Sequence, residues 1–337
     1  MVNNTFKIEN RRYTGSKAKL IDWIFTLIKQ ECKGEVFADI FAGTGVVAAE
    51  ATKSFKSIIL NDFLFSNEII YKAFFKNEDW DKDKLKIVIN NYNALNPNEI
   101  EDNYFSSNFG DKYFDLEVSK LVGFIRNDIE VNKKQLNDKE YSILLASLIY
   151  SIDRIANTVG HFDAYIRKTP IDKKLNLKLI EPILGVKSQI YRQDANLLAK
   201  KIIADVVYID PPYNSRQYSR FYHVFETLIK WDNPKLYGVA LKPEPENTSE
   251  YSKTSAPKVF NDLIEDLNCK YIVVSYSNNY NPKSHSSKNK ITLEQIENSL
   301  NQKGKTKKYT RSHKFFNSGK TNFDNHQELL FITKVNG

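Results

Sequence analysis

The chain has 337 residues, of which 41% are hydrophobic, so it can bury a substantial core in one large or two ordinary domains. Its two cysteines, Cys32 and Cys269, are too few for a disulfide framework and favour a reducing compartment. No run has the apolar length of a signal peptide or a membrane span, so we expect a cytoplasmic protein with no membrane partner. The net charge of +8 suits a polyanionic partner such as nucleic acid, although a lysine-rich solvated surface gives the same balance.

The first part of the chain reads as a helix followed by a βαβ unit. Residues 18 to 31 place five apolar side chains on one helical face: Leu20, Trp23, Ile24, Leu27 and Ile28. A short strand at 36 to 38, a glycine turn, a helix from about Val46 and a second buried strand at 56 to 62 then follow. This order is typical of a parallel sheet, in which ligand chemistry lies at the carboxyl ends of the strands.

Residues 66 to 190 have a different character, because lysine, asparagine and aspartate dominate and the recognisable pieces are helical. The clearest piece, 138 to 157, carries a wide apolar face. We therefore expect an inserted, mostly helical region between two parts of one sheet.

After the insertion the strand pattern returns. Strands are expected within 204 to 213, at 270 to 278 and at 328 to 335. The basic segment 303 to 316 reads as a loop region before the last strand, and 241 to 253 as an exposed loop. The fold class is therefore α/β.

The glycine turn fits a nucleotide-binding pattern. Gly43 and Gly45 open a G-x-G-x-x-A run after the first strand, and Asp62 lies nineteen residues beyond Gly43. Such glycines let the backbone approach a ligand, and such an acid accepts the ribose hydroxyls. Asp39, at the strand end, would repel a pyrophosphate but would favour a cation such as the ammonium group of S-adenosylmethionine. A tight turn without a ligand is the alternative.

A second strand ends in Asp210-Pro211-Pro212-Tyr213. The prolines fix φ and donate no N–H, so the Asp210 carboxylate and the carbonyls of Asp210 and Pro211 remain as acceptors beside an aromatic ring. An exocyclic amine fits this array, because its two N–H groups meet the acceptors while its ring stacks on Tyr213. Holding both hydrogens raises the electron density of the amine, which favours direct attack on a sulfonium methyl group.

The segment "RYTGSKAKL" (12 to 20) contains glycine, serine and lysine but is not a phosphate loop. Its serine precedes its lysine, and the earlier glycine of that loop is missing. A basic loop at the start of a helix can still hold a carboxylate, and a solvated helix cap is the alternative.

These motifs together resemble the D12 class of DNA adenine N6-methyltransferases, in the Dam-like (alpha) order of cofactor, target recognition and catalysis. The resemblance is carried by "RYTGSK", "DIFAGTG" and "IDPPYNSRQYS". The strings "DPPYNSRQYSRFYHVFET" and "ANTVGHFDAYIR" are similar to a subgroup of type II modification enzymes. It implies a Rossmann-like methyltransferase domain formed by 1–65 and 191–337, and a target-recognition region at 66–190.

The resemblance also implies a chemistry. S-adenosylmethionine would be the cofactor, double-stranded DNA the partner, and a flipped adenine the target, with no metal required. A cognate restriction endonuclease becomes a candidate partner. Methylation would depend on Asp210 as main acceptor, with Pro211, Pro212 and Tyr213 completing the catalytic motif.

The cofactor-binding residues implied by the resemblance are Tyr13, Gly15, Ser16, Lys17, Asp39, Phe41, Gly43, Gly45, Asp62 and Asp194. Tyr13 and Lys17 would hold the methionine end of the cofactor. Asp62 would take its ribose, and Asp194 its adenine.

Candidate DNA contacts are the basic, amide or imidazole side chains Arg216, Gln217, His161, Arg167, Lys307, Lys308 and Arg311. The alternative for Arg216 and Gln217 is local capping. The alternative for His161 and Arg167 is a packed loop that supports the active site, and for the basic stretch 303 to 316 it is a solvated hairpin.

Two other classes of function stay open on sequence alone. Cytosine-N4 enzymes usually carry serine in place of Asp210 and RNA adenine dimethylases asparagine, so the motif disfavours both without excluding them. A non-catalytic DNA-binding module would also keep this fold, but the intact glycines and the intact motif argue against it.

Overall fold

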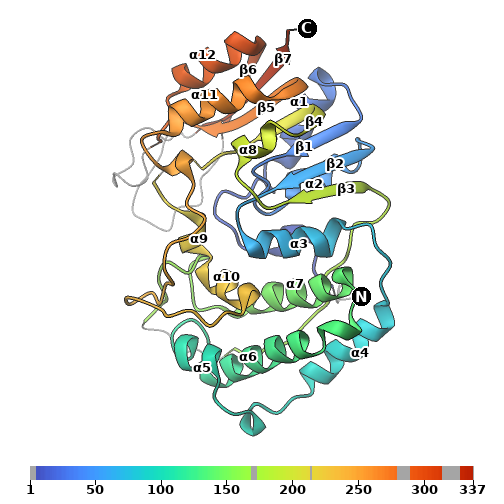
Figure 1. Cartoon of the computed structure of the whole chain (residues 1–337), viewed down its shortest axis with the longest axis vertical. Helices are drawn as coiled ribbons and strands as arrows, with labels where there is room; N and C mark the ends of the chain where they lie inside the picture. The colour runs from blue at the N-terminus through green and yellow to red at the C-terminus, as the bar shows by residue number, and fades with distance from the viewer. Residues whose placement is uncertain (1–4, 168–172, 213–214, 279–288, 313–326, 337) are drawn as a thin grey trace. The chain divides into compact units, whose positions relative to one another are not determined.

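The structure, a computed structural model, describes residues 5–167, 173–212, 215–278, 289–312 and 327–336 (Figure 1). The chain divides into two compact units. The first consists of Met1–Ser16, Leu64–Ile190 and Ser219–Glu246. The second consists of Lys17–Phe63, Tyr191–Tyr218 and Asn247–Gly337.

The second unit is built on a mostly parallel sheet. Its strands are β1 (Val36–Asp39), β2 (Ser57–Asn61), β4 (Ile203–Ile209), β5 (Asn268–Ser277), β6 (Gly304–Ser312) and β7 (Gln327–Val335). The seven-stranded order is β3-β2-β1-β4-β5-β7-β6, where β3 (Lys187–Tyr191) contains the division between the units. Strands β2, β1, β4 and β5 pair in parallel, while β7 is antiparallel to both β5 and β6. The α/β, Rossmann-like fold expected from the sequence is thus confirmed.

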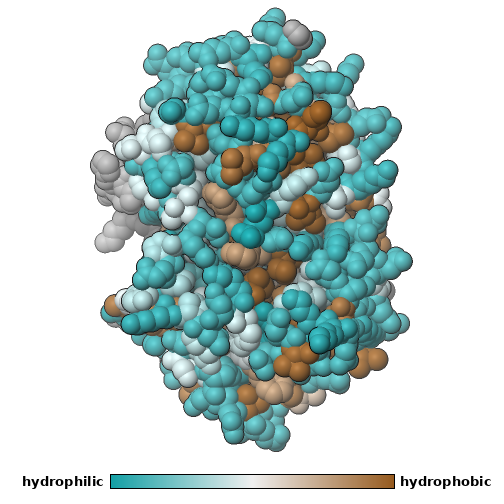
Figure 2. Space-filling model, viewed as in Figure 1, coloured by the Kyte–Doolittle hydropathy of each residue, from teal (hydrophilic) through white to brown (hydrophobic). Residues whose placement is uncertain are grey.

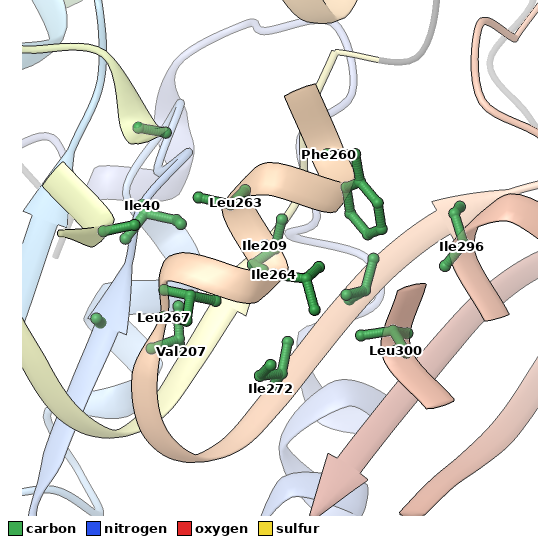
Figure 3. Close-up of a cluster of buried hydrophobic side chains, with 14 of the residues drawn as sticks. Ile40, Val207, Ile209, Phe260, Leu263, Ile264, Leu267, Ile272, Ile296 and Leu300 are labelled. Carbon is green, nitrogen blue, oxygen red and sulfur yellow. The ribbon is translucent and has the colours of Figure 1, made fainter. Parts of the chain in front are cut away.

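Helices bury both faces of this sheet. They are α1 (Ile21–Glu31), α2 (Val46–Ala51), α8 (Ala195–Ala199), α11 (Ala256–Asp266) and α12 (Leu293–Lys303). Alternate strand residues, such as Val207 and Ile209, pack against α8, α11 and α12 in one apolar cluster (Figure 3). The intervening residues point the other way, and Phe37 contacts Phe25 of α1 with ring centroids 5.9 Å apart. The apolar side chains that alternate along the central strands therefore meet helices on both faces.

One aspartate joins the starts of two parallel strands. Asp205 Oδ2 accepts hydrogen bonds from the backbone N–H groups of Glu35 (2.7 Å) and Val36 (3.0 Å), and Oδ1 pairs with Lys270 Nζ at 2.7 Å. The hydrogen bond from Lys270 is the largest contribution that lowers the pKa of Asp205, to about 2. A Cβ on Gly34 would lie 2.1 Å from the Asp205 Cβ, so glycine is required there.

The first unit is helical. Its longer helices are α3 (Phe65–Phe75), α4 (Lys82–Asn93), α6 (Leu116–Val131), α7 (Asp138–Ile155) and α10 (His223–Lys230), with the short helices α5 (Tyr104–Phe109) and α9 (Tyr218–Phe221). The helix expected at 138 to 157 is α7. It begins with a capping box, in which Asn137 and Glu140 each bond the backbone N–H of the other, and almost its whole length is buried.

Two segments differ from the sequence-based expectation. Residues 304 to 312, expected as part of a loop region, form the edge strand β6. Lysine and arginine side chains on an edge strand hide the strand pattern and protect its unpaired edge. Within the expected loop 241 to 253, Tyr251 is buried.

Hydrophilic residues predominate on the face shown in Figure 2, where hydrophobic residues form several separate groups. In the described part of the chain, no helix combines the length and the apolar character needed to cross a membrane.

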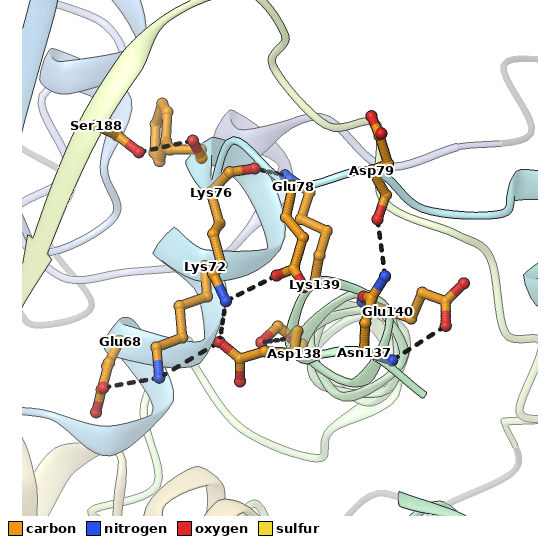
Figure 4. Close-up of polar contacts among 12 residues, drawn as sticks. Glu68, Lys72, Lys76, Glu78, Asp79, Asn137, Asp138, Lys139, Glu140 and Ser188 are labelled. Atoms are coloured by element: carbon orange, nitrogen blue, oxygen red, sulfur yellow. Dashed lines mark hydrogen bonds and ion pairs between the residues drawn. The ribbon is translucent and has the colours of Figure 1, made fainter. Parts of the chain in front are cut away.

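Lys139 is a fully buried cation at the start of α7. Its ammonium group donates to the backbone carbonyl of Lys76 at 2.8 Å, beside the ion pairs of Lys76 with Glu78 and Asp138 (Figure 4). Burial lowers the pKa of Lys139 to about 8, and the ammonium of Lys76 acts in the same direction, while Glu78 opposes them.

We expect this lysine to give the protein a distinctive pH dependence. The unfolded chain binds its proton more tightly than the folded chain does, so the free energy of unfolding should rise with pH between about 8 and 10.4. The slope from this group is at most about 1.4 kcal/mol per pH unit. Urea unfolding of the wild type and Lys139→Met at several pH values isolates it, because the variant loses only this titration. Parallel pH curves for the two proteins would contradict the assignment.

Candidate active site

Three aspartates stand at the carboxyl edge of the parallel strands. Asp39 is the last residue of β1, Asp62 follows β2, and Asp210 directly follows β4. Because β1 pairs with β2 on one side and with β4 on the other, the three carboxylates belong to adjacent strand ends. Open parallel sheets bind their ligands at this edge.

The glycine turn is fixed to the second aspartate. Gly43 and Gly45 have φ values of 51° and 78°, in the left-handed region that glycine adopts without strain. Gly45 caps α2 and donates its N–H to the carbonyl of Ala42 at 2.7 Å. The N–H of Gly43 donates to Asp62 Oδ2 at 3.0 Å. A hydrogen bond therefore joins the glycine turn to Asp62, the residue predicted to bind the ribose.

Asp39 is a buried carboxylate in an acidic environment. Only 1% of the residue is exposed, and neither oxygen makes a hydrogen bond of standard geometry to any described residue. Burial raises its pKa well above the ordinary value, and the charges of Asp210 and Asp62 raise it further, while the nearby backbone of Phe41 and Ala48 opposes this. A cationic ligand bound beside Asp39 would offset the cost of burying its ionised carboxylate.

Lys17 and Asp210 form a buried ion pair. Lys17 Nζ lies 2.8 Å from Asp210 Oδ2, and the lysine is almost completely buried. Burial alone would lower the pKa of Lys17, but the carboxylates of Asp210, Glu328 and Asp39 outweigh it and raise the pKa. The ammonium predicted to meet the cofactor's methionine end thus lies against the predicted catalytic carboxylate. Its predicted contact with the cofactor stays a prediction.

The rest of the catalytic motif follows Asp210. Pro211 is buried and Pro212 half-buried, while Tyr213 lies outside the described residues. Two residues before the aspartate, Tyr208 is fully buried. Its pKa is raised well above the ordinary value by burial and then by the charge of Asp210.

Asp194 and Phe41 are linked through a tyrosine that the sequence analysis placed in a loop. Asp194 Oδ1 caps α8 by accepting from the N–H groups of Asn196 and Leu197. Asn196 Oδ1 accepts from the Tyr251 hydroxyl at 2.8 Å. The Tyr251 ring meets Phe41 edge to face, with centroids 5.0 Å apart. Asp194, the residue predicted to meet the cofactor's adenine, is thus linked through Asn196 to the aromatic pair of Tyr251 and Phe41.

The first two candidate DNA contacts are partly engaged within the second unit. The Gln217 amide exchanges two hydrogen bonds with the backbone of Ser249, at 2.8 and 3.1 Å. Arg216 has an exposed side chain, and its carbonyl accepts from the Ser252 hydroxyl at 3.2 Å. The alternative of a local structural role is therefore favoured for Gln217.

The basic candidates on β6 are exposed but not equivalent. Lys307 pairs with Glu31 and Lys308 with Glu297, each at 2.6 Å. Arg311 makes no ion pair with a described side chain.

The remaining cofactor residues of the N-terminal motif lie in the first unit, whose first segment ends at Ser16. The ring of Tyr13 is stacked on Tyr222, with centroids 4.6 Å apart and planes 5° apart. Gly15 has a φ of 82°, and the N–H of Ser16 donates to the carbonyl of Tyr13 at 3.3 Å.

His161 and Arg167 belong to a loop that is packed against helices of the same unit. The His161 ring is stacked on Phe221, with centroids 4.6 Å apart, whereas Arg167 is exposed. His223 Nε2 lies 3.0 Å from the carbonyl of Phe162. Burial lowers the pKa of His223 to about 3, so this histidine is neutral and supports the loop.

Several residues of these arrangements were missed in the sequence analysis: Arg11, Tyr222, Glu226, Tyr251 and Glu328. Glu328 is buried and lies on β7. A buried acid within the apolar run "ELLFITKV" is a signal that could have marked it.

Known proteins similar to this chain share one activity class. A model of the D12 class N6 adenine-specific DNA methyltransferases matches residues 13–291. Type II methyltransferase M.FokI of Planomicrobium okeanokoites is 33% identical over 79% of this chain and 44% of its own length. Type II methyltransferase M.NlaIII of Neisseria lactamica is 31% identical over 79% of this chain and 83% of its own.

A third relative covers nearly the whole chain. Type II methyltransferase M.CviAII of Paramecium bursaria Chlorella virus 1 is 29% identical over 96% of this chain and 98% of its own length. By contrast, the chain spans less than half the length of M.FokI. Because the family model extends from the "RYTGSK" segment past β5, the chain belongs to the D12 class of N6 adenine-specific DNA methyltransferases.

Proposed function

We propose that the chain transfers a methyl group from S-adenosylmethionine to N6 of an adenine flipped out of double-stranded DNA. The observation that carries this proposal is the buried carboxylate of Asp39 beside the Lys17–Asp210 pair. Asp39 suits the ammonium group of the cofactor and Asp62 its ribose, while the Gly43 to Gly45 turn leaves room for close backbone approach. S-adenosylmethionine supplies an electrophilic methyl group.

The catalytic role falls to the strand end at Asp210. The ion pair with Lys17 fixes the orientation of the Asp210 carboxylate, which accepts an N6–H of the adenine. The carbonyl of Pro211 is a second acceptor, because the next residue is proline and donates no N–H in return. Positive charge develops on N6 as its bond to the methyl carbon forms and the bond from that carbon to sulfur breaks. Both acceptors stabilise this charge in the transition state.

The names of the relatives support a role in a type II restriction–modification system, with a cognate endonuclease as the functional partner. We further propose that residues 66–190 read the target sequence, while 1–65 and 191–337 carry cofactor binding and catalysis. The helices α3 to α7 support the first assignment. The two cysteines are both free, in keeping with action in the cytoplasm.

Replacing the proposed catalytic carboxylate should slow methylation strongly. We expect Asp210→Ala to slow methyl transfer by about 100-fold or more, because an acceptor aimed at the developing charge is lost. Sequencing that detects N6-methyladenine, on DNA from cells expressing wild type, Asp210→Ala or the exposed control Glu294→Ala, measures this and gives the target site. Methylation that persists in Asp210→Ala would favour a different catalytic group, and its absence with soluble wild type would favour an RNA substrate or a binding module.

Neutralising Asp39 should separate stability from cofactor binding. Since the folded protein raises the pKa of this acid, its ionised form destabilises the fold near neutral pH, and Asp39→Asn should raise the melting temperature of the apoprotein. The same change should raise the Kd for S-adenosylmethionine by about tenfold or more, because a buried charge partner is lost. Calorimetry measures both quantities.

Asp205→Asn is the matched control for this experiment. The pKa of Asp205 is lowered rather than raised, so its variant should melt at a lower temperature and keep the wild-type Kd. An unchanged Kd in Asp39→Asn would remove Asp39 from the cofactor site.

The basic edge strand is tested through salt dependence. Each phosphate contact contributes about 0.9 to the slope of log K against log salt concentration. We expect Arg311→Ala to reduce that slope more than Lys308→Ala, because the Lys308 ammonium already pairs with Glu297. Fluorescence anisotropy with a duplex at several salt concentrations measures the slopes. Equal slopes in wild type and both variants would take β6 out of the DNA interface.

A further inference from the structure

Tyr222 joins the N-terminal motif to the chain that follows the catalytic segment. It is fully buried and occupies the N-cap position of α10. Its ring is stacked on Tyr13, and its hydroxyl oxygen accepts from the backbone N–H of Thr14 at 2.8 Å. One side chain therefore fixes both the ring of Tyr13 and the direction of the next peptide group.

Arg11 reinforces the same contact from the other side of the motif. Its buried guanidinium carbon lies 5.0 Å from the ring centroid of Tyr13, 5.3 Å from that of Tyr222 and 5.6 Å from that of Phe225. Arg11 Nη1 donates to Asn67 Oδ1 on α3 at 2.5 Å, whereas Nε and Nη2 make no hydrogen bond to a described residue. Three aromatic rings and one hydrogen-bond acceptor therefore surround the Arg11 guanidinium. A shift of these rings would change the environment of a buried charge.

Glu226 anchors the helix that carries Tyr222. Its two carboxylate oxygens accept from the N–H groups of Phe65 and Ser66 at 2.9 Å each, which caps the start of α3. The segment 11–14, the start of α3 and the helix α10 form one buried arrangement inside the first unit. Contacts within the first unit therefore set the position of Tyr222.

We propose that Tyr222 is a positioning residue, which holds the Tyr13 to Gly15 segment in the conformation that binds the cofactor. This inference rests on the proposed function, since it takes that segment to contact S-adenosylmethionine. It assigns to Tyr222, at the start of α10, a role in cofactor affinity, although this residue follows the catalytic motif and lies outside the segments "RYTGSK" and "DIFAGTG". The hydroxyl acts on the backbone at Thr14, and the ring acts on Tyr13.

The test compares Tyr222→Phe with wild type. Phenylalanine keeps the stack on Tyr13 and the contact with Arg11, and removes only the acceptor for Thr14. We expect the Kd for S-adenosylmethionine to rise about fivefold, as for the loss of one ordinary hydrogen bond. The kcat at saturating cofactor and DNA should stay within about twofold, because the change acts on binding rather than on the reacting atoms.

Tyr141→Phe is the matched control. Tyr141 is a buried tyrosine of the same unit whose hydroxyl donates to Glu130 at 2.7 Å, far along the sequence from the motif. A purely structural role for Tyr222 predicts that both variants lose thermal stability and keep the wild-type Kd, and that outcome would overturn the inference. A higher Kd in Tyr222→Phe alone supports it. Failure of the wild type to bind S-adenosylmethionine would instead overturn the proposed function.

Discussion

The ion pair between Lys17 and Asp210 constrains the candidate site more than any other contact. Both groups are largely removed from water, and a buried charge is tolerated only when its partner is held in place. Lys17 lies just before α1 and Asp210 just after β4, so the pair joins the start of a helix to the end of a central strand. Its loss would leave a buried charge at the position where chemistry is proposed.

The pair does not neutralise its surroundings. Among the described side chains at this edge, the single ammonium of Lys17 faces the carboxylates of Asp39, Asp210 and Glu328. These carboxylates raise the pKa of Lys17 against the effect of burial. The pKa of Asp39 is raised first by burial and then by the charges of Asp210 and Asp62. A site with this balance favours a ligand that carries positive charge, such as a sulfonium or an ammonium group, and disfavours a pyrophosphate.

Local sequence patterns predicted the parts of the fold that local chemistry determines. Sequence patterns showed the strands β1, β2, β4, β5 and β7 as short apolar runs, because these strands are buried. They also showed the glycine turn, and the helix α7 through its helical period of apolar residues. The strand β6 was not visible, since its lysines meet water and its pairing with β7 is a tertiary contact. Tyr251 was placed in an exposed loop because the proline and glutamate around it dominate the pattern.

The candidate site shows the same limit. Asp39, Asp62 and Asp210 were found because each follows a recognisable strand. Tyr222 and Glu328 were missed because their partners are remote in sequence. Tyr222 contacts Thr14 across 208 positions, and Glu328 acts on Lys17 from the last strand. The acid in "ELLFITKV" marks Glu328 as unusual, but a single sequence does not show which remote residue it acts on.

The chain passes between the two units next to several of the candidate site residues. The chain passes from one unit to the other between Ser16 and Lys17, directly inside the N-terminal motif, and again just after Asp62. It passes again after Ile190, after Tyr218, which lies shortly beyond the catalytic motif, and after Glu246. The candidate cofactor residues Ser16, Lys17 and Asp62 therefore stand next to crossing points. Tyr222 and Glu226 fix the backbone within the helical unit, and Asp205 fixes the strand that leads to Asp210 within the sheet unit. If the proposed function holds, substitutions near these crossing points should alter cofactor affinity through the covalent chain.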